Sequence, residues 1–253
     1  MVYLGFIPSE IELHSLYDNY SDYKGYSSSI KFQKKMSWLS KVKKAHVDIL
    51  IAIIERYGLM PNKKICEIGA SYGEFLQLAR HKGSKVKAVE IDEKSCDFLE
   101  KELRISTYRQ IKDLPESQDI ICAKSVFEHL ENPGEIIAEV HDKLHSDGML
   151  LLSLPNGANF ETIGHSWAGF RVDFEHLNYW SPKTLSEFLA RFGFYVEQYW
   201  EINQLATARG EHKSVSIIKR ILGYLLPKRS FDPFLVGKAT LIVLARKAPA
   251  PSV

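Results

Sequence analysis

Apolar and polar positions follow a repeating order along the middle of the chain. Short apolar runs predict strands over Lys64–Ile68, Lys85–Glu90, Asp119–Ala123 and Met149–Leu154. Amphipathic stretches between them predict helices over Gly73–His81, Ser95–Leu103 and Gly134–Leu144. Strands that alternate with helices of this length are typical of a parallel sheet with helices on both faces. A further apolar helix is predicted over Val47–Tyr57, ahead of Gly58 and Pro61.

The pattern changes after Pro155. Asn156–Tyr179 is rich in glycine, aromatic residues and histidine and is predicted to be a long loop. A helix is expected over Pro182–Phe192, with Ser181 as its N-cap. Two last strands are predicted over Tyr195–Glu201 and Thr240–Ala245.

A chain of 253 residues with this pattern fits one α/β domain. We divide it into an N-terminal lid or cap (1–45), a Rossmann-like core (46–202), a helical insertion (203–238), and a last strand with a frayed tail (239–253).

Composition and charge argue against several partners and locations. A net charge of +2 provides no global field that would attract nucleic acid. No stretch approaches the roughly 18 apolar residues of a membrane span, and Met1–Ser9 lacks the basic and apolar regions of a secretory signal. The spacing of Cys66, Cys96 and Cys122 fits neither a zinc site nor a disulfide framework. We therefore expect a cytoplasmic protein with reduced thiols and no metal.

A small-residue turn between the first strand and its helix is the most informative segment. Gly69 and Gly73 allow backbone conformations and a ligand approach that a Cβ would block. The turn lies at the carboxyl end of a central strand, where open α/β sheets place their ligand crevice. Amides at the helix start are expected to favour an anionic group of that ligand.

The turn does not suit a dinucleotide. In the fingerprint G-x-G-x-x-G, the second and third glycine positions would be Ser71 and Glu74, and Glu74 would lie near a pyrophosphate. S-adenosylmethionine carries no phosphate, and its ammonium suits a carboxylate such as Glu67. Glu90, at the end of the next strand, is placed to accept hydrogen bonds from both ribose hydroxyls.

These residues resemble those of the class I S-adenosylmethionine-dependent methyltransferases. The stretch from Glu67 to Gly73 resembles their motif I, [DE]-x-G-x-G-x-G, with Ser71 in place of the middle glycine. Asp119–Leu130 resembles a later segment of the family, and Glu175–Leu185 resembles a segment common in its small-molecule branch. The resemblance implies a seven-stranded sheet that ends in an antiparallel strand pair. It also implies that the cofactor is bound by Glu67, Gly69, Ala70, Ser71, Gly73, Glu90, Ile91, Ala123 and Lys124.

Two histidines are candidates for the base that a hydroxyl acceptor requires. His129 follows the fourth strand and His176 lies in the long loop, both on the cofactor side of the sheet. We favour His176, because the loop is best able to present a side chain to a variable acceptor. The alternative for each is a structural histidine that anchors its loop. An acceptor pocket is predicted from Tyr20, Trp167, Phe170 and Tyr179, which otherwise hold their loops in place.

The expected function is transfer of a methyl group to a small molecule at oxygen, the acceptor being a sugar, a nucleotide-linked sugar or another biosynthetic intermediate. One alternative is a nucleic-acid or protein methyltransferase, although Lys124–Phe127 differs from the N-P-P-[YF] type of many base methylators. Another is a protein that binds S-adenosylmethionine without catalysis. The apolar stretch Val215–Leu226, with Lys219 and Arg220, is compatible with weak contact to a membrane surface or with packing on the domain.

Overall fold

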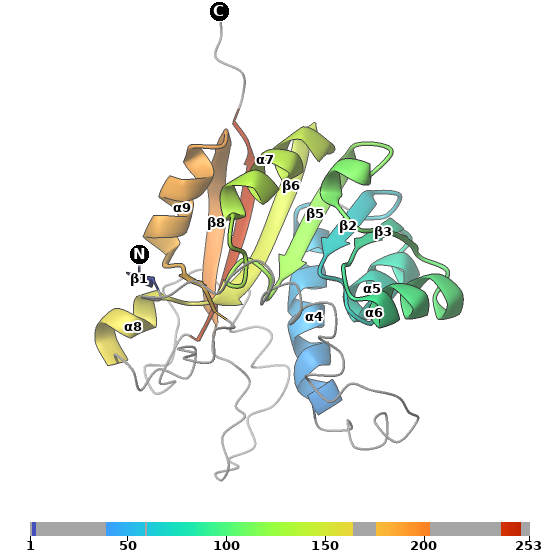
Figure 1. Cartoon of the computed structure of the whole chain (residues 1–253), viewed down its shortest axis with the longest axis horizontal. Helices are drawn as coiled ribbons and strands as arrows, with labels where there is room; N and C mark the ends of the chain where they lie inside the picture. The colour runs from blue at the N-terminus through green and yellow to red at the C-terminus, as the bar shows by residue number, and fades with distance from the viewer. Residues whose placement is uncertain (1, 4–38, 59, 164–175, 203–238, 249–253) are drawn as a thin grey trace, which may run out of the picture.

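The computed structural model describes residues 2–3, 39–58, 60–163, 176–202 and 239–248 (Figure 1). Several sequence predictions lie outside these ranges. They are residues 1 and 4–38 of the lid, the insertion 203–238 with Val215–Leu226, and three of the four predicted acceptor-pocket residues, Tyr20, Trp167 and Phe170.

A seven-stranded sheet forms the centre of the molecule (Figure 1). Its strands are β2 (Lys64–Ile68), β3 (Lys85–Val89), β4 (Ser106–Tyr108), β5 (Gln118–Lys124), β6 (Leu144–Pro155), β8 (Phe194–Ile202) and β9 (Thr240–Lys247). Their order is β4-β3-β2-β5-β6-β9-β8. The first five in this order are parallel, whereas β9 is antiparallel to both β6 and β8. The predicted Rossmann-like sheet with an antiparallel C-terminal pair is confirmed.

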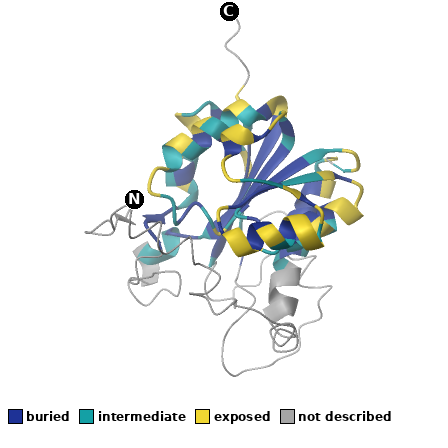
Figure 2. Cartoon of the chain, turned by 45° about the vertical axis from the view of Figure 1, so that its right-hand side comes forward, coloured by how far each residue is buried: buried dark blue, intermediate teal, exposed yellow. Residues whose placement is uncertain are grey.

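Helices cover both faces of the sheet. One face packs against α4 (Leu39–Arg56), α5 (Glu74–His81) and the short π-helix Phe98–Glu102 that follows α6 (Glu93–Asp97). The opposite face packs against α7 (Pro133–Lys143) and α9 (Pro182–Ala190). Figure 2 shows the sheet as a buried layer between exposed helix surfaces. Burial on both faces explains why the central strands read as continuous apolar runs.

Short-range signals fix the start of two helices. The Asp92 carboxylate accepts a hydrogen bond from the Ser95 amide at 2.8 Å, so α6 begins at Glu93, two residues before the predicted start. The predicted cap of α9 is present, since the Ser181 hydroxyl accepts from the Thr184 amide and the Thr184 hydroxyl accepts from the Ser181 amide.

Some elements were not predicted. Helix α4 begins at Leu39 and therefore extends into the segment assigned to the lid. The predicted loop after Pro155 contains α8 (Ala158–Ile163) and β7 (Asn178–Tyr179), which pairs with β1 (Val2–Tyr3). Strands β1, β4 and β7 have two or three residues, too few for a periodic pattern to register.

Two predictions from composition concern the cysteines and membrane spans. Cys66, Cys96 and Cys122 are free and buried, as the apolar runs around Cys66 and Cys122 predicted for those two. Among the described residues, no helix combines the length and apolar character needed to cross a bilayer.

Candidate cofactor and active site

The glycine turn requires its glycines for two separate reasons. Gly69 and Gly73 have φ values of +67° and +69°, in the left-handed region. A Cβ on Gly69 would lie 2.5 Å from Cγ2 of Val126, and one on Gly73 would lie 2.7 Å from Cδ2 of Leu99. Both close approaches therefore depend on the missing side chain. Ser71, at the middle glycine of the motif, also has a positive φ of 49°.

The amides of this turn are largely used within the protein. Gly69 N donates to the Val89 carbonyl oxygen and Gly73 N to the Ala70 carbonyl oxygen, both at 2.8 Å. Ser71 N donates to Oε2 of Glu90 at 2.7 Å. These three amides therefore fix the shape of the turn, whereas the anionic group was expected at the amides of the helix start, from Glu74 onward.

Glu90 ties the glycine turn to the end of β3. Its Oε2 accepts the Ser71 amide, while its Oε1 accepts the amides of Ile91 and Asp92 at 2.8 and 2.9 Å. Burial raises the pKa of the Glu90 carboxyl despite these three hydrogen bonds, which act in the opposite direction. The sequence predicted that Glu90 binds a ribose, but it did not predict that Glu90 holds the glycine turn against the end of β3.

Glu67 is a buried carboxyl group that no described residue hydrogen-bonds. Its relative exposure is 1 %, and both carboxylate oxygens lack a partner among the described residues. Burial raises the pKa of Glu67 to about 8, against the opposing effect of the Lys124 ammonium at the end of β5. A buried carboxyl without a partner is costly unless a cation or donor meets it. A positively charged ligand group placed at Glu67 would remove this cost.

A histidine of α4 that was not among the predicted site residues lies near the carboxyl ends of the central strands. Nε2 of His46 lies 2.8 Å from Oγ of Ser153, and Ser153 pairs in register with Lys124 of β5. Burial first and then the Lys124 charge lower the pKa of His46 to about 4, so the imidazole is neutral at pH 7. No sequence motif marks this pair, because its two residues come from distant elements.

Both predicted base candidates lie together in one cluster. The rings of His129 and His176 meet edge to face with their centroids 4.9 Å apart. Glu128, which was not among the predicted site residues, lies with them, and its Oε1 is 3.8 Å from Nε2 of His129. Burial raises the pKa of Glu128 to about 8. Both candidate bases therefore belong to one group of three adjacent side chains, Glu128, His129 and His176.

The cluster is joined to the glycine turn through the segment after β5. Val126 contacts Gly69, and its carbonyl oxygen accepts the His129 amide at 2.9 Å. Ser125 has a positive φ of 54° and donates its amide to the Ser153 carbonyl oxygen at 2.7 Å. These contacts fix the segment that connects β5 to Glu128 and His129.

The other predicted residues occupy different environments. Ala70 and Ala123 are buried at the strand ends. Ile91 is 51 % exposed directly after Glu90. Tyr179, predicted to contact the acceptor, is buried in β7, and its ring centroid lies 6.1 Å from that of His176. Tyr179 thus packs beside the candidate base.

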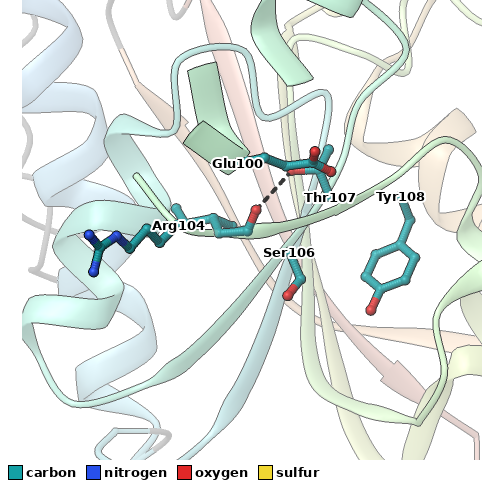
Figure 3. Close-up of a pocket in the computed structure, with 6 residues that line it drawn as sticks. Glu100, Arg104, Ser106, Thr107 and Tyr108 are labelled. Atoms are coloured by element: carbon teal, nitrogen blue, oxygen red, sulfur yellow. Dashed lines mark hydrogen bonds between the residues drawn. The ribbon is translucent and has the colours of Figure 1, made fainter. Parts of the chain in front are cut away.

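A separate pocket lies at the outer strand β4 of the sheet (Figure 3). Its lining residues are Glu100, Arg104, Ile105, Ser106, Thr107 and Tyr108. The Thr107 hydroxyl donates to the Ile105 carbonyl oxygen at 3.1 Å. Because none of the buried acids or histidines described above lines it, this pocket is not the candidate site.

The strand order, with β9 antiparallel to both of its neighbours, defines the class of Rossmann-like methyltransferase folds. The glycine turn after β2 fits this class, because it is not a phosphate-binding loop. The chain belongs to the methyltransferase-domain family, whose family model matches residues 43–199. This match covers the strands and helices that carry the site, and it agrees with the resemblance found in the motifs.

Relatives and solved structures are consistent with this assignment. An uncharacterized protein of Haemophilus influenzae is 34% identical over 112 residues, which are 38% of this chain and 44% of that protein. The chain thus matches less than half the length of this relative. Magnesium protoporphyrin IX methyltransferase from Synechocystis has a TM-score of 0.59 at 14% identity, covering 95% of this chain and 100% of that chain.

A second solved structure, the 1,6-didemethyltoxoflavin-N1-methyltransferase of Burkholderia thailandensis, also has a TM-score of 0.59 at 14% identity. The alignment covers 97% of this chain and 93% of that chain. At this identity the likeness concerns the fold.

Proposed function

We propose that this protein transfers a methyl group from S-adenosylmethionine to a small-molecule acceptor, at an oxygen atom. The observation that carries the proposal is Glu67, a buried carboxyl without a partner among the described residues, directly before the glycine turn. Of the common cofactors that bind this edge of an α/β sheet, S-adenosylmethionine brings a cationic amino group and no phosphate. The family membership of the chain points in the same direction.

The residues present fit this cofactor in three places. Glu67 would accept a hydrogen bond from its ammonium. Oε2 of Glu90 accepts one amide and retains a lone pair for a ribose hydroxyl. The exposed Ile91 side chain offers an apolar surface for the adenine ring. Ala70, Ser71, Ala123 and Lys124 complete the predicted cofactor set around these contacts.

The bound cofactor would supply a methyl group on a sulfonium that an acceptor displaces in line. The protein's own contribution is to align the acceptor, exclude water and take up a proton if the acceptor is a hydroxyl. Glu128, His129 and His176 are the side chains suited to the last task, because they form one titratable group, two of whose members follow β5. A hydroxyl is the acceptor that needs such a group, which favours oxygen over a neutral amine.

The class of acceptor is supported by the fold neighbours. Two of them are named for small molecules, magnesium protoporphyrin IX and 1,6-didemethyltoxoflavin, and structures of both contain S-adenosylhomocysteine. The second is named as an N1-methyltransferase, so the fold alone does not select oxygen.

The test begins with cofactor binding. Calorimetry should detect binding of S-adenosylmethionine to the wild type, and Gly69→Val should abolish it, because the new side chain meets Val126 and strains a positive φ. Gly58→Val is the matched control, since Gly58 has a similar φ of +69° but a Cβ added there would have no atom within 4 Å. Normal binding by Gly69→Val would contradict the cofactor assignment.

Methyl transfer is tested separately with metabolite extracts and cofactor labelled in the methyl group. The expected result is a labelled small molecule, absent with Gly69→Val, whose label resists the treatments that cleave labelled nucleic acid or protein. Label that enters macromolecules would favour the nucleic-acid or protein methyltransferase alternative. Cofactor binding without transfer to any fraction would indicate a non-catalytic binding protein.

A further inference from the structure

We propose that Glu128, His129 and His176 bind a divalent transition-metal ion. Each residue offers one ligand atom, and these atoms all lie within 4.8 Å of one another. The two imidazole rings meet edge to face, and the Glu128 carboxylate lies beside them. Two imidazoles and one carboxylate are a ligand set typical of zinc and related ions.

The Glu128 carboxylate is not satisfied by hydrogen bonds from its described neighbours. Oε1 of Glu128 is 3.8 Å from Nε2 of His129, which is too long for a hydrogen bond. The other carboxylate oxygen, Oε2, is buried and has no partner among the described residues, and the side chain is only 2 % exposed. A buried carboxylate oxygen in this state is costly, and an ion between the three side chains would remove the cost.

The backbone around the cluster is already held in place. The amides of Leu177 and Asn178 both donate to the Glu128 carbonyl oxygen, at 2.7 and 3.0 Å. The Asn178 side-chain amide donates to the Leu130 carbonyl oxygen at 2.6 Å. Two segments far apart in the sequence are thus joined beside the ligands. Such support is what a preorganised metal site requires.

The ligand types decide which ions are suitable. Mg²⁺ and Ca²⁺ prefer oxygen ligands, so two imidazoles disfavour them. Zn²⁺ binds histidine nitrogen and carboxylate oxygen at about 2.0–2.2 Å, in a tetrahedral arrangement. The three ligand atoms must therefore draw closer by roughly 1 Å on binding, which side-chain rotation can provide. Three protein ligands leave a fourth position for water or an acceptor oxygen.

This inference deepens the proposed function in one respect. A hydroxyl bound to such an ion loses its proton near neutral pH, so the ion would replace an imidazole as the group that acidifies the acceptor. Metal binding itself does not depend on the methyl transfer, and it is measured without acceptor or cofactor.

The test uses untagged full-length protein, treated with a chelator and then dialysed. Titration with zinc chloride by calorimetry should give one site per chain, and cobalt(II) chloride should give the intense visible absorption of tetrahedral cobalt. His176→Ala and Glu128→Gln should each weaken zinc binding by at least about 100-fold, because each removes a direct ligand. His145→Ala is the control, because this exposed histidine lies at the opposite end of β6 and should leave binding unchanged.

Folding and cofactor binding are monitored in parallel. Each variant should retain S-adenosylmethionine affinity, which separates loss of the metal site from collapse of the domain or failure of the proposed function. Wild-type protein that binds zinc no more tightly than His176→Ala would overturn the metal site. Zinc binding with methyl transfer that is unchanged by chelation would support the site and refute its part in catalysis.

Discussion

Replacement of Glu67 by Gln should stabilise the protein and weaken its cofactor binding at the same time. Burial raises the Glu67 pKa from 4.5 to about 8, so at pH 7 the folded chain keeps a proton that the unfolded chain releases. At about 1.36 kcal/mol per pKa unit, this difference lowers the free energy of unfolding by roughly 3 kcal/mol at pH 7. Glu67→Gln has nearly the same shape and no such titration, so it should recover a large part of that free energy.

The sign of the pH dependence distinguishes this mechanism from a change in packing. The wild type should lose stability relative to Glu67→Gln as the pH rises from about 4.5 to about 8, and the two should be equally stable at pH 4. Urea unfolding measured at several pH values gives the difference directly. A difference that stays constant between pH 4 and pH 8 would refute the assignment of a buried, protonated carboxyl.

Cofactor binding supplies the second half of the prediction. Binding of the S-adenosylmethionine ammonium should ionise Glu67, so the wild type should release about one more proton than Glu67→Gln when the cofactor binds near pH 7. Calorimetry in two buffers of different ionisation enthalpy measures this number. The variant should also bind about 10- to 150-fold more weakly, the equivalent of a charge-assisted hydrogen bond of roughly 1.5–3 kcal/mol. Equal proton release and equal affinity would remove Glu67 from the cofactor site.

Two further predictions concern neighbouring residues. Glu90→Gln should weaken S-adenosylmethionine binding by about 10-fold or more and lower the melting temperature, because the carboxamide nitrogen would face a backbone amide whose hydrogen bond the carboxylate now accepts. Calorimetry measures the affinity and thermal unfolding the melting temperature. An unchanged affinity would exclude Glu90 from cofactor binding. His46 has a folded-state pKa of about 4 against 6.5, so its contribution to stability is complete above pH 6.5 and is lost as the pH falls toward 4, by at most about 3 kcal/mol. Urea unfolding of His46→Gln should lack this part of the acid destabilisation, whereas identical pH profiles would show that the imidazole is not buried in its neutral form.

The order of strands and helices could be predicted because each central element carries its own local signal. Strands β2, β3, β5 and β6 are apolar runs that end at a turn, and the predicted bounds of the first three agree closely with those observed, whereas β6 begins earlier than predicted, at Leu144. The antiparallel end of the sheet came from the family resemblance rather than from the periodicity. The short strands β1, β4 and β7 have no comparable signal, because two or three residues do not establish an alternation.

The sequence by itself determined the glycine turn, the acids at the ends of β2 and β3, and the two histidines as candidates, since these lie within contiguous motifs. Only the tertiary structure decided what those residues do to each other. It buried Glu67 without a described partner, joined His46 to Ser153, and brought Glu128 and His129 against His176. A pKa, a hydrogen bond or a ligand set depends on distances between segments far apart in the chain, and those distances exist only when the sheet and its loops have assembled.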